Sequence, residues 1–470
     1  MCIFLVRNPP PGNYFQRLTL AQDRNSAYNY WVLDLAGPDG TLFPSGKASS
    51  VIAKAGYLLR NVTVTEDSLS LVGDFNATTS IEILGGAPRA LEELNVNGEP
   101  VYFNLTVHDV AEADFTYRAP SFTLPKLGQL QWKYIDTLPE IKSSYEDDDW
   151  VSANLSKTAN SKRNLTTPTS LYSSDYGFHT GTLIYRGHFK ATGNETTFYV
   201  QAQGGSGFGF SVWVDSTYLG SFAGFDAASS GNSTFTLPSK LTAGNSHVFT
   251  VLIDNMGLDE NWIVGLEEMK NPRGILNFEL AGHPKNDITW KLTGNLGGEE
   301  YRDKIRGPLN EGGLFAERQG YHLPSPPSGQ WAKSGGPTEG ISAAGVGFFA
   351  TSFDLNLPNG YDIPLAFVFA NATTTNSTAK ASAYRAQLFV NGYQFGKYVH
   401  NIGPQGKFPV PEGILNHHGK NWLAVSLWSQ EKNGAKLDGF ELEAQAAVLS
   451  GYGSIASSPT NNWAQRQDAY

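Results

Sequence analysis

The sequence predicts an all-β protein, with a small β-sandwich followed by two jelly-roll sandwiches and preceded by the tail of another all-β domain. Short runs of alternating apolar and polar residues, together with 50 glycines and 25 prolines, predict many short strands joined by turns. No long stretch repeats apolar residues at the spacing of a helix face. At 470 residues the chain is too long for one hydrophobic core, so about three domains are expected.

Residues 1–54 are predicted to be an irregular head followed by the end of an all-β domain. The run Pro9-Pro10-Pro11 cannot enter regular structure, because proline has no backbone N–H. From Leu18 onward the residue types are those of strands, yet no partner strands precede them. Residues 55–125 are predicted to form the small sandwich, which includes a hairpin turn at Asn97-Gly98.

Residues 126–290 and 291–470 are predicted to be two copies of a jelly roll, the second opening with a linker that wraps over both. In FSVWVDSTYLGSF, Val212 and Val214 lie on one face of a strand and Trp213 on the other. The turn of this hairpin is Asp215-Ser216. The run AQLFVNGYQFGKY, 386–398, repeats the pattern around an Asn-Gly turn. Such a repeat indicates domain duplication, and about eight strands per copy suit a jelly roll.

The charge and the cysteine content exclude several classes of protein. A formal net charge of −10 argues against nucleic-acid binding, which needs a basic face. Cys2 is the single cysteine, so no intrachain disulfide is possible. No apolar run approaches the roughly eighteen residues of a membrane helix, and the apolar start MCIFLV is too short for a signal-peptide core. Neither a nucleic acid nor a membrane is expected as a partner.

Nine Asn-X-Ser/Thr acceptors are candidate N-glycosylation sites, and such sites lie in surface loops of secreted proteins. They are Asn61, Asn76, Asn104, Asn154, Asn164, Asn194, Asn232, Asn371 and Asn376. Many acceptors without a signal peptide suggest a secreted protein whose N-terminal part is missing.

No residue is predicted to be catalytic, to bind a cofactor or to bind a metal. A glycosidase needs two carboxylates about 5 Å or about 6.5–9.5 Å apart, and spacing singles out none of the acidic residues here. Those considered are Asp259, Glu260, Glu267, Glu268, Glu299, Glu300, Glu311 and Glu317. Surface or loop-anchoring salt bridges are their more frequent role. The adjacent pair His417-His418 lacks the spacing of metal ligands.

Three further features each have two interpretations. The acidic run Glu146–Asp149 is either a cation site or, more often for adjacent side chains, a solvated loop before a buried Trp150. The run Gly204–Gly209 is similar to a phosphate loop but lacks the helix and the Lys-Ser/Thr pair, so a strand crossing is favoured. Aromatic residues of the hairpins are either a sugar platform or, more often, core. They are Trp213, Tyr218, Phe222, Phe389, Tyr393 and Tyr398.

A set of longer motifs closely resembles the C-terminal half of the fungal secreted β-galactosidases of glycoside hydrolase family 35. The resemblance covers nearly everything from Leu18 to Tyr470 and leaves the first seventeen or so residues unmatched. The motifs include DRNSAYNYWV (Asp23–Val32), WKYIDTLPEIKSSY (Trp132–Tyr145), YRGHF (Tyr185–Phe189), DNMGLDENW (Asp254–Trp262), RGPLNEGGL (Arg306–Leu314), VNGYQFGKY (Val390–Tyr398) and FPVPEGILN (Phe408–Asn416).

The resemblance implies a multidomain extracellular enzyme that releases terminal non-reducing β-D-galactose with retention. Its activity would reside in an N-terminal (β/α)₈ barrel with two glutamates, followed by an all-β domain, a small sandwich and two galactose-binding-like jelly rolls. No position of this sequence matches either glutamate, so the chain is expected to supply β domains that pack around a missing barrel. A truncated gene model, a gene fragment and a separate β module all fit this expectation.

Two other hypotheses belong to different classes. The first is a stand-alone carbohydrate-binding β-sandwich module without hydrolase activity, which rests on analogy at the level of the fold. The second is a partner that docks on a separately supplied barrel through an exposed apolar patch.

Overall fold

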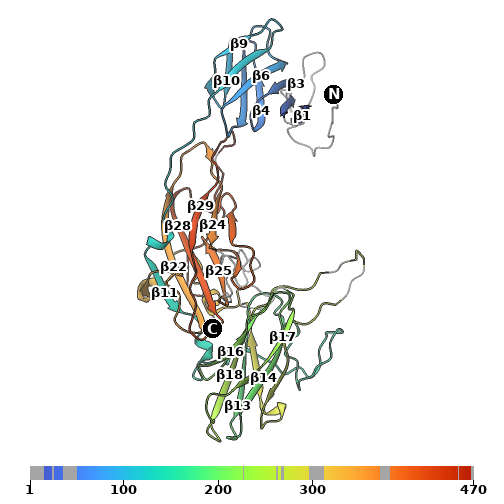
Figure 1. The fold of residues 1–470 in the computed structure, drawn as a ribbon, viewed down its shortest axis with the longest axis vertical. Coiled ribbons are helices and arrows are strands. Elements are labelled where there is room, and N and C mark those ends of the chain that lie inside the picture. Colours follow the sequence, from blue (N-terminus) through green and yellow to red (C-terminus); the bar gives the residue numbers. More distant parts are fainter. Residues whose placement is uncertain are drawn as a thin grey trace. The chain divides into compact units, whose positions relative to one another are not determined.

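The computed structural model describes residues 15–23, 26–34, 50–225, 227–260, 263–265, 269–295, 312–370, 382–453 and 455–466. These residues fold into β-sandwiches, which confirms the predicted all-β class (Figure 1). They divide into two compact units. Unit 1 takes the described residues of Met1–Leu124, Asn356–Leu365 and Ala444–Ala456, and unit 2 takes the rest.

Unit 1 is a small sandwich with a six-stranded sheet in the order β1-β2-β3-β6-β10-β9 and a four-stranded sheet in the order β4-β5-β7-β8. Alternating residues of both sheets fill one core, as Ile81 and Ile83 of β6 and Leu69 and Leu71 of β5 show. The strands are β1 (Phe15–Asp23), β2 (Ser26–Asp34), β3 (Ser50–Lys54), β4 (Leu58–Val64), β5 (Ser68–Asp74), β6 (Thr79–Gly85), β7 (Glu93–Val96), β8 (Glu99–Pro100), β9 (Phe103–Leu105) and β10 (Ala111–Phe115).

Two expected boundaries differ from the structure of unit 1. The boundary at residue 54 falls inside one sheet, because Ala53 of β3 pairs with Ile83 of β6. The segments 356–365 and 444–456, expected in the second jelly roll, belong to unit 1 and pair as β23 (Tyr361–Asp362) and β30 (Val448–Leu449). Alternation identifies a strand, but it does not identify the sheet that the strand joins.

The first jelly roll of unit 2 packs a six-stranded sheet, β12-β20-β13-β18-β15-β16, on a three-stranded sheet, β17-β14-β19. Its core contains Val212 and Val214, as their alternation predicted. The strands are β12 (Val151–Ser152), β13 (Leu183–Lys190), β14 (Thr197–Gln203), β15 (Phe210–Val214), β16 (Thr217–Phe222), β17 (Ser230–Thr236), β18 (Ser246–Ile253), β19 (Gly274–Leu280) and β20 (Thr289–Thr293).

The second jelly roll repeats this arrangement, with sheets in the orders β21-β11-β22-β28-β25-β26 and β27-β24-β29. The matching orders confirm the predicted duplication. The strands are β11 (Trp132–Asp136), β21 (Ala332–Ser334), β22 (Gly345–Asn356), β24 (Leu365–Phe369), β25 (Tyr384–Val390), β26 (Tyr393–Val399), β27 (Lys407–Val410), β28 (His418–Ser429) and β29 (Phe440–Ala444).

The strand β11 departs from the predicted domains, because residues 126–290 were expected to form the first jelly roll alone. Tyr134 of β11 pairs with Phe349 of β22, and Trp132 pairs with Ser334 of β21. In Figure 1 the teal strand β11 lies beside the orange strand β22. A segment that precedes the first jelly roll therefore completes the sheet of the second.

Helical structure is short in the described residues. The described ranges contain one α-helix, α1 (Phe315–Arg318). The 3₁₀ turns are η1 (Leu127–Gln129), η2 (Pro139–Ile141), η3 (Ser173–Tyr176), η4 (Lys285–Asp287) and η6 (Ser328–Gln330). No helix among the described residues is long and apolar enough to cross a membrane.

The predicted hairpin turns form as their residue types require. Asn391 has φ 48° and Gly392 has φ 88°, and the turn joins β25 to β26. Asp215 and Ser216 at the equivalent turn of the first jelly roll also have positive φ. Asn-Gly and similar pairs tolerate this left-handed backbone, which matches the twist of the strands that they join.

Candidate functional site

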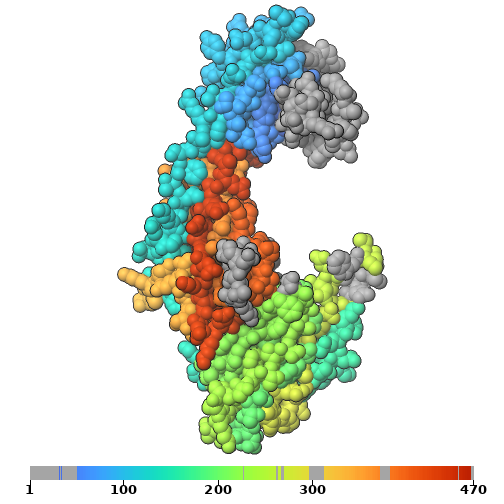
Figure 2. Space-filling model, in the orientation of Figure 1, coloured from blue at the N-terminus to red at the C-terminus, as the bar shows by residue number. Residues whose placement is uncertain are grey.

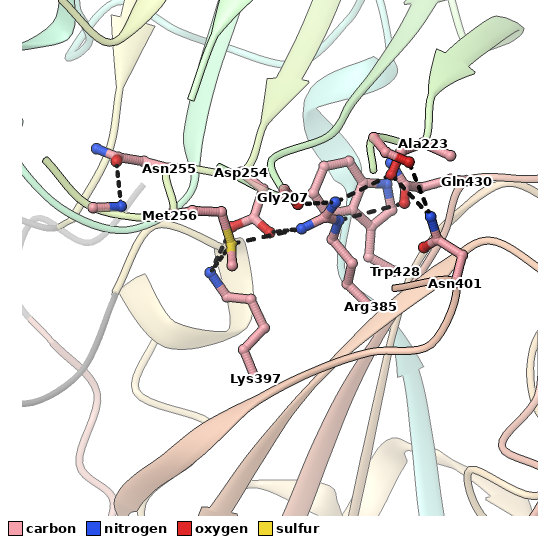
Figure 3. Close-up of polar contacts among 12 residues, drawn as sticks. Gly207, Ala223, Asp254, Asn255, Met256, Arg385, Lys397, Asn401, Trp428 and Gln430 are labelled. Carbon is pink, nitrogen blue, oxygen red and sulfur yellow. Dashed lines mark hydrogen bonds and ion pairs between the residues drawn. The ribbon is translucent and has the colours of Figure 1, made fainter. Parts of the chain in front are cut away.

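A buried group of ion pairs joins the two jelly rolls (Figure 3). Asp254 directly follows β18 of the first jelly roll, whereas Arg385 and Lys397 lie on β25 and β26 of the second. One carboxylate oxygen of Asp254 accepts a hydrogen bond from Arg385 Nη1 at 2.5 Å, and the other accepts one from Lys397 Nζ at 2.6 Å. We call these three residues the junction cluster.

The glycine-rich run Gly204–Gly209 brings a backbone carbonyl to the guanidinium of Arg385. Arg385 Nη2 donates to the carbonyl of Gly207 at 2.7 Å and to that of Ala223 at 3.2 Å. A Cβ on Gly204 would lie 2.5 Å from the carbonyl oxygen of Asp254, so a larger residue cannot stand there. The run connects β14 in one sheet to β15 in the other, as the strand crossing predicted.

The junction cluster keeps its charges in a buried setting. The side chains of Asp254 and Arg385 are 1% and 3% exposed. Burial alone would raise the pKa of Asp254, but Lys397 and Arg385 outweigh this effect and hold the pKa below its ordinary value. The carboxylate therefore stays ionised, and it ties one sandwich to the other.

Apolar side chains from both jelly rolls pack together beside this cluster. Trp213 comes from the first sandwich and Trp428 from the second, whose indole Nε1 donates to Ser211 Oγ at 3.0 Å. The buried members are Leu138, Trp150, Ile184, Trp213, Leu252, Leu314, Val346 and Trp428. In Figure 2 the green and the orange-red side chains meet along a continuous surface on the face shown. The two jelly rolls therefore form one packed body, in agreement with their place in a single unit.

Arg186, the arginine of YRGHF, holds the connecting segment that precedes the first jelly roll. From the middle of β13 it donates to the backbone carbonyls of Glu140 at 3.0 Å, Lys142 at 2.8 Å and Tyr145 at 2.9 Å. Its guanidinium also lies 5.3 Å from the ring centroid of Tyr145. Arg186 is 0% exposed, and its N–H groups donate to acceptors of this one segment. It therefore fixes the path of the segment.

A second buried ion pair links the same segment to helix α1. Glu140 of η2 pairs with Arg318 of α1, and both side chains are fully buried. Burial raises the pKa of Glu140, although Arg318 opposes the rise. Glu317, also on α1, accepts hydrogen bonds from the backbone N–H groups of Gly312 and Leu314 at 3.0 Å and 3.1 Å.

Three residues of the acidic run Glu146–Asp149 are exposed, as a solvated loop predicts, whereas Asp147 is not. Asp147 is buried and pairs with Arg186, His188 at 2.7 Å and Lys291 at 3.1 Å. Burial tends to raise the pKa of Asp147, but these partners lower it well below its usual range. The described residues contain no group of three or more side chains arranged to hold a metal ion. Trp150 is buried, as predicted.

The structure describes three of the candidate carboxylates, Asp259, Glu260 and Glu317, and the first two line the same pocket. Asp259 pairs with Arg273 at 2.8 Å and accepts from Asn271, which lowers its pKa against the effect of burial. Glu260 is exposed. Glu267, Glu268, Glu299, Glu300 and Glu311 lie outside the described residues, as does Cys2.

The hairpin aromatics are core and interface residues rather than an open sugar platform. Trp213, Phe389 and Tyr398 are each about 1% exposed, so their faces cannot receive a sugar. Tyr218, Phe222 and Tyr393 are half-buried. Tyr218 donates through its hydroxyl to the carbonyl of Gln430 at 2.6 Å, which adds a further link between the jelly rolls.

The structure gives the positions of seven of the nine glycosylation candidates and of the histidine pair. Asn61, Asn76, Asn104, Asn154, Asn164, Asn194 and Asn232 are all exposed. Asn371 and Asn376 lie outside the described residues. His417 Nε2 lies 3.9 Å from a carboxylate oxygen of Glu412, and His418 begins β28.

The residues that join the two sandwiches were not predicted from the sequence. Their signal was present, because LIYRGHF and YRAQLFV each place an arginine inside an otherwise apolar strand. Arginine is almost never fully buried without a partner, so such a position predicts a buried ion pair. Asp254, at the end of the apolar run VFTVLID, gives the same signal for the opposite charge.

Buried ion pairs join the two duplicated jelly rolls. This class of protein is therefore one of structural β domains. A family model described as "Beta-galactosidase second all-beta domain" matches residues 145–259 and again residues 315–433. A model described as "Beta-galactosidase, domain 3" matches residues 31–110. The chain belongs to the β-galactosidase family, and the parts that it matches are all-β domains.

Curated relatives agree with this assignment. The chain is 57% identical over 452 residues to "Beta-galactosidase A" of Aspergillus oryzae and 55% identical over 455 residues to that of Aspergillus niger. These alignments cover 95% and 96% of this chain but only 44% of each relative. The chain therefore spans less than half the length of the curated relatives that it matches. A solved β-glucuronidase of Bacteroides uniformis aligns with a TM-score of 0.20 at 12% identity, over 68% of this chain and 27% of that one.

Proposed function

We propose that this chain is the structural β-domain portion of a secreted β-galactosidase that hydrolyses terminal non-reducing β-D-galactose residues with retention. Its partner is a catalytic (β/α)₈ barrel, and galactosides or galactose-containing polysaccharides are the substrates of the two together. The observation that carries the proposal is the junction cluster with its surrounding apolar side chains, because it turns two sandwiches into one rigid support.

The domain division is part of the proposal. We infer a small sandwich from β1 to β10, a first jelly roll from β12 to β20, and a second from β21 to β29 that also takes β11. The connecting segment held by Arg186 and Arg318 belongs to the support rather than to either sandwich alone.

The chemistry of the site supports a non-catalytic role for the described residues. Glycoside hydrolysis by two carboxylates requires one of them to act as an acid and the other to face the sugar. Here Asp254, Asp147 and Asp259 are held by arginines or lysines, which lower their pKa values and make them poor proton donors. Glu140 has a raised pKa, but it is fully buried against Arg318.

An extracellular location is also proposed. It is supported by the fungal relatives and by the seven exposed sequons, which glycosylation enzymes could reach.

The test has two parts and uses the full chain. The purified chain is assayed with a chromogenic β-galactoside, and no turnover is expected. Turnover that a galactose-mimicking inhibitor abolishes would overturn the non-catalytic role.

In the second part, the chain is mixed with the portion of the Aspergillus niger relative that the alignment leaves uncovered. Size-exclusion chromatography is expected to show a complex, together with a higher melting temperature of the barrel. The variant Lys407→Ala, which removes an exposed ion pair with Glu443, serves as a control and should behave like the parent chain. Absence of a complex would contradict the support role.

A further inference from the structure

The side chain of Met256 contacts both cations of the junction cluster. Its sulfur lies 3.6 Å from Arg385 Nη1 and 3.6 Å from Lys397 Nζ, beside the two groups that hold Asp254 (Figure 3). A thioether sulfur is a weak hydrogen-bond acceptor. Arg385 and Lys397 therefore give their strong hydrogen bonds to the carboxylate of Asp254, and the contact with the sulfur adds little.

The backbone around Met256 is held in place, and this determines where the sulfur lies. The N–H of Met256 donates to the carbonyl of Gly204 at 2.7 Å, and the N–H of Gly257 donates to Asn255 Oδ1 at 3.0 Å. Met256 is therefore anchored to the glycine-rich run that also supplies a carbonyl to the junction cluster.

Solvent reaches Met256, although it does not reach most of the junction cluster. The side chains of Asp254, Arg385 and Lys397 are 1%, 3% and 9% exposed, whereas residue Met256 is 37% exposed. Met256 lines a pocket of about 670 Å³ together with Asp259. A small solute can therefore meet the sulfur while the ion pairs stay buried.

Oxidation by a peroxide is the chemistry open to an exposed thioether. A sulfur lone pair attacks one oxygen of hydrogen peroxide, and the O–O bond breaks. The attacked oxygen stays on the sulfur as a sulfoxide, and its proton passes to the departing hydroxide, which leaves as water. The sulfur loses two electrons and the peroxide gains them, so the step needs no further reactant. The sulfoxide oxygen accepts hydrogen bonds more strongly than the thioether does, because the product is polar.

We propose that Met256 is an oxidation site for peroxides, and that Arg385 and Lys397 bind the oxygen of its sulfoxide. The S–O bond is shorter than the 3.6 Å between the sulfur and each cation, so the new oxygen can come within hydrogen-bond distance of either nitrogen. Each of these nitrogens carries more than one N–H, so Asp254 keeps its own bonds.

Oxidation therefore ties the loop that follows β18 to the second jelly roll by a hydrogen bond to a cation, where the reduced side chain has only a weak contact. The proposal involves neither the barrel nor a galactoside, so it does not depend on the proposed function.

Met269 provides a comparison within the same pocket. It is 46% exposed, and its sulfur accepts from the backbone N–H of Ser161 at 3.0 Å and lies 3.7 Å from Ser161 Oγ. Both donors are uncharged and belong to the same jelly roll as Met269. A sulfoxide at Met269 is therefore not expected to link the two sandwiches.

The test uses the full chain and hydrogen peroxide. Met269→Leu keeps Met256 as the oxidisable methionine of the pocket, and Met256→Leu keeps Met269. Peptide mapping measures the added oxygen, of about 16 Da, at each position. Met1 and Cys2 are present in both variants, so their oxidation does not affect the comparison.

Hydrogen exchange of residues 204–209 and 254–257 is then compared before and after oxidation. In Met269→Leu the exchange should slow at least about tenfold, the effect of one hydrogen bond to a charged group. In Met256→Leu it should not change. Reduction with methionine sulfoxide reductases, one for each sulfoxide epimer, should restore the original rate.

A further variant links the effect to the cations. Lys397→Leu in the Met269→Leu chain removes one of the two donors beside the sulfur, while Arg385 still pairs with Asp254. The slowing on oxidation should be smaller in this chain, and equal slowing would contradict the assigned partners.

A sulfoxide at Met256 that leaves the exchange unchanged or speeds it would overturn the proposal. So would a Met256 that stays reduced when Met269 is fully oxidised, or equal slowing in Met256→Leu. None of these measurements involves turnover of a galactoside or binding of the barrel, so failure here is distinguishable from failure of the proposed function.

Discussion

Replacing Arg385 with methionine is the most direct perturbation of the junction cluster. Methionine has a similar reach but carries no charge. The change therefore leaves Asp254 buried with Lys397 as its remaining partner in the cluster. It also removes the donors that satisfy the carbonyls of Gly207 and Ala223. Breaking a buried pair by removing one partner costs about 3–5 kcal/mol, so the melting temperature of unit 2 should fall by roughly 4–7 °C.

Differential scanning calorimetry of the full chain measures this effect. The matched control is Lys407→Met, whose pair with Glu443 has both side chains about half exposed and should cost at most about 1 kcal/mol. The double variant Asp254→Asn with Arg385→Met should recover part of the loss, because the buried carboxylate that has lost its arginine is then gone. If Arg385→Met costs no more than Lys407→Met, the junction cluster does not hold the jelly rolls together.

Two further predictions concern the sandwiches themselves. The pKa of Glu195 is lowered to about 2, because its hydrogen bonds to His283 and to backbone N–H groups outweigh the effect of burial. The contribution of Glu195 to stability is therefore fully present above its ordinary pKa of about 4.5 and is lost as the pH falls through about 2. The melting-temperature difference between the parent and Glu195→Gln should shrink across this window, and a difference independent of pH would contradict the reasoning. Gly224→Ala should destabilise unit 2 by at least about 2 kcal/mol in urea unfolding, since φ is +79° and the new Cβ would lie 1.9 Å from the carbonyl oxygen of Phe208. Gly98→Ala, with positive φ but open space, should cost only about 1–2 kcal/mol, and equal losses at the two glycines would refute the steric argument.

Local chemistry made much of the fold predictable from the sequence. Asn391-Gly392 and Asn97-Gly98 form hairpins because these residues tolerate positive φ, which is a property of the residues themselves. The strand that contains Val212 and Val214 was predictable for the same reason, since alternation is read along one short segment.

Pairing between distant segments was not predictable in this way. The run WKYID alternates like any strand, and nothing within it indicates that it pairs with β22 rather than with the jelly roll that follows it. The burial of Asp147 was not predictable for a related reason, because its partners are Arg186, His188 and Lys291, all distant in the sequence.

The place of β11 also bears on how the chain is made. Thr137, just after β11, bonds to Val346 of β22 across 209 residues of sequence. At the usual rate of synthesis, β11 waits roughly 10–40 s before its partner strand leaves the ribosome. During that interval the first jelly roll can fold, while β11 remains an unpaired strand that must be kept from pairing with other chains. The second sandwich is thus completed by the oldest part of the nascent unit, and cutting the chain between residues 290 and 291 would deprive it of a strand from its larger sheet.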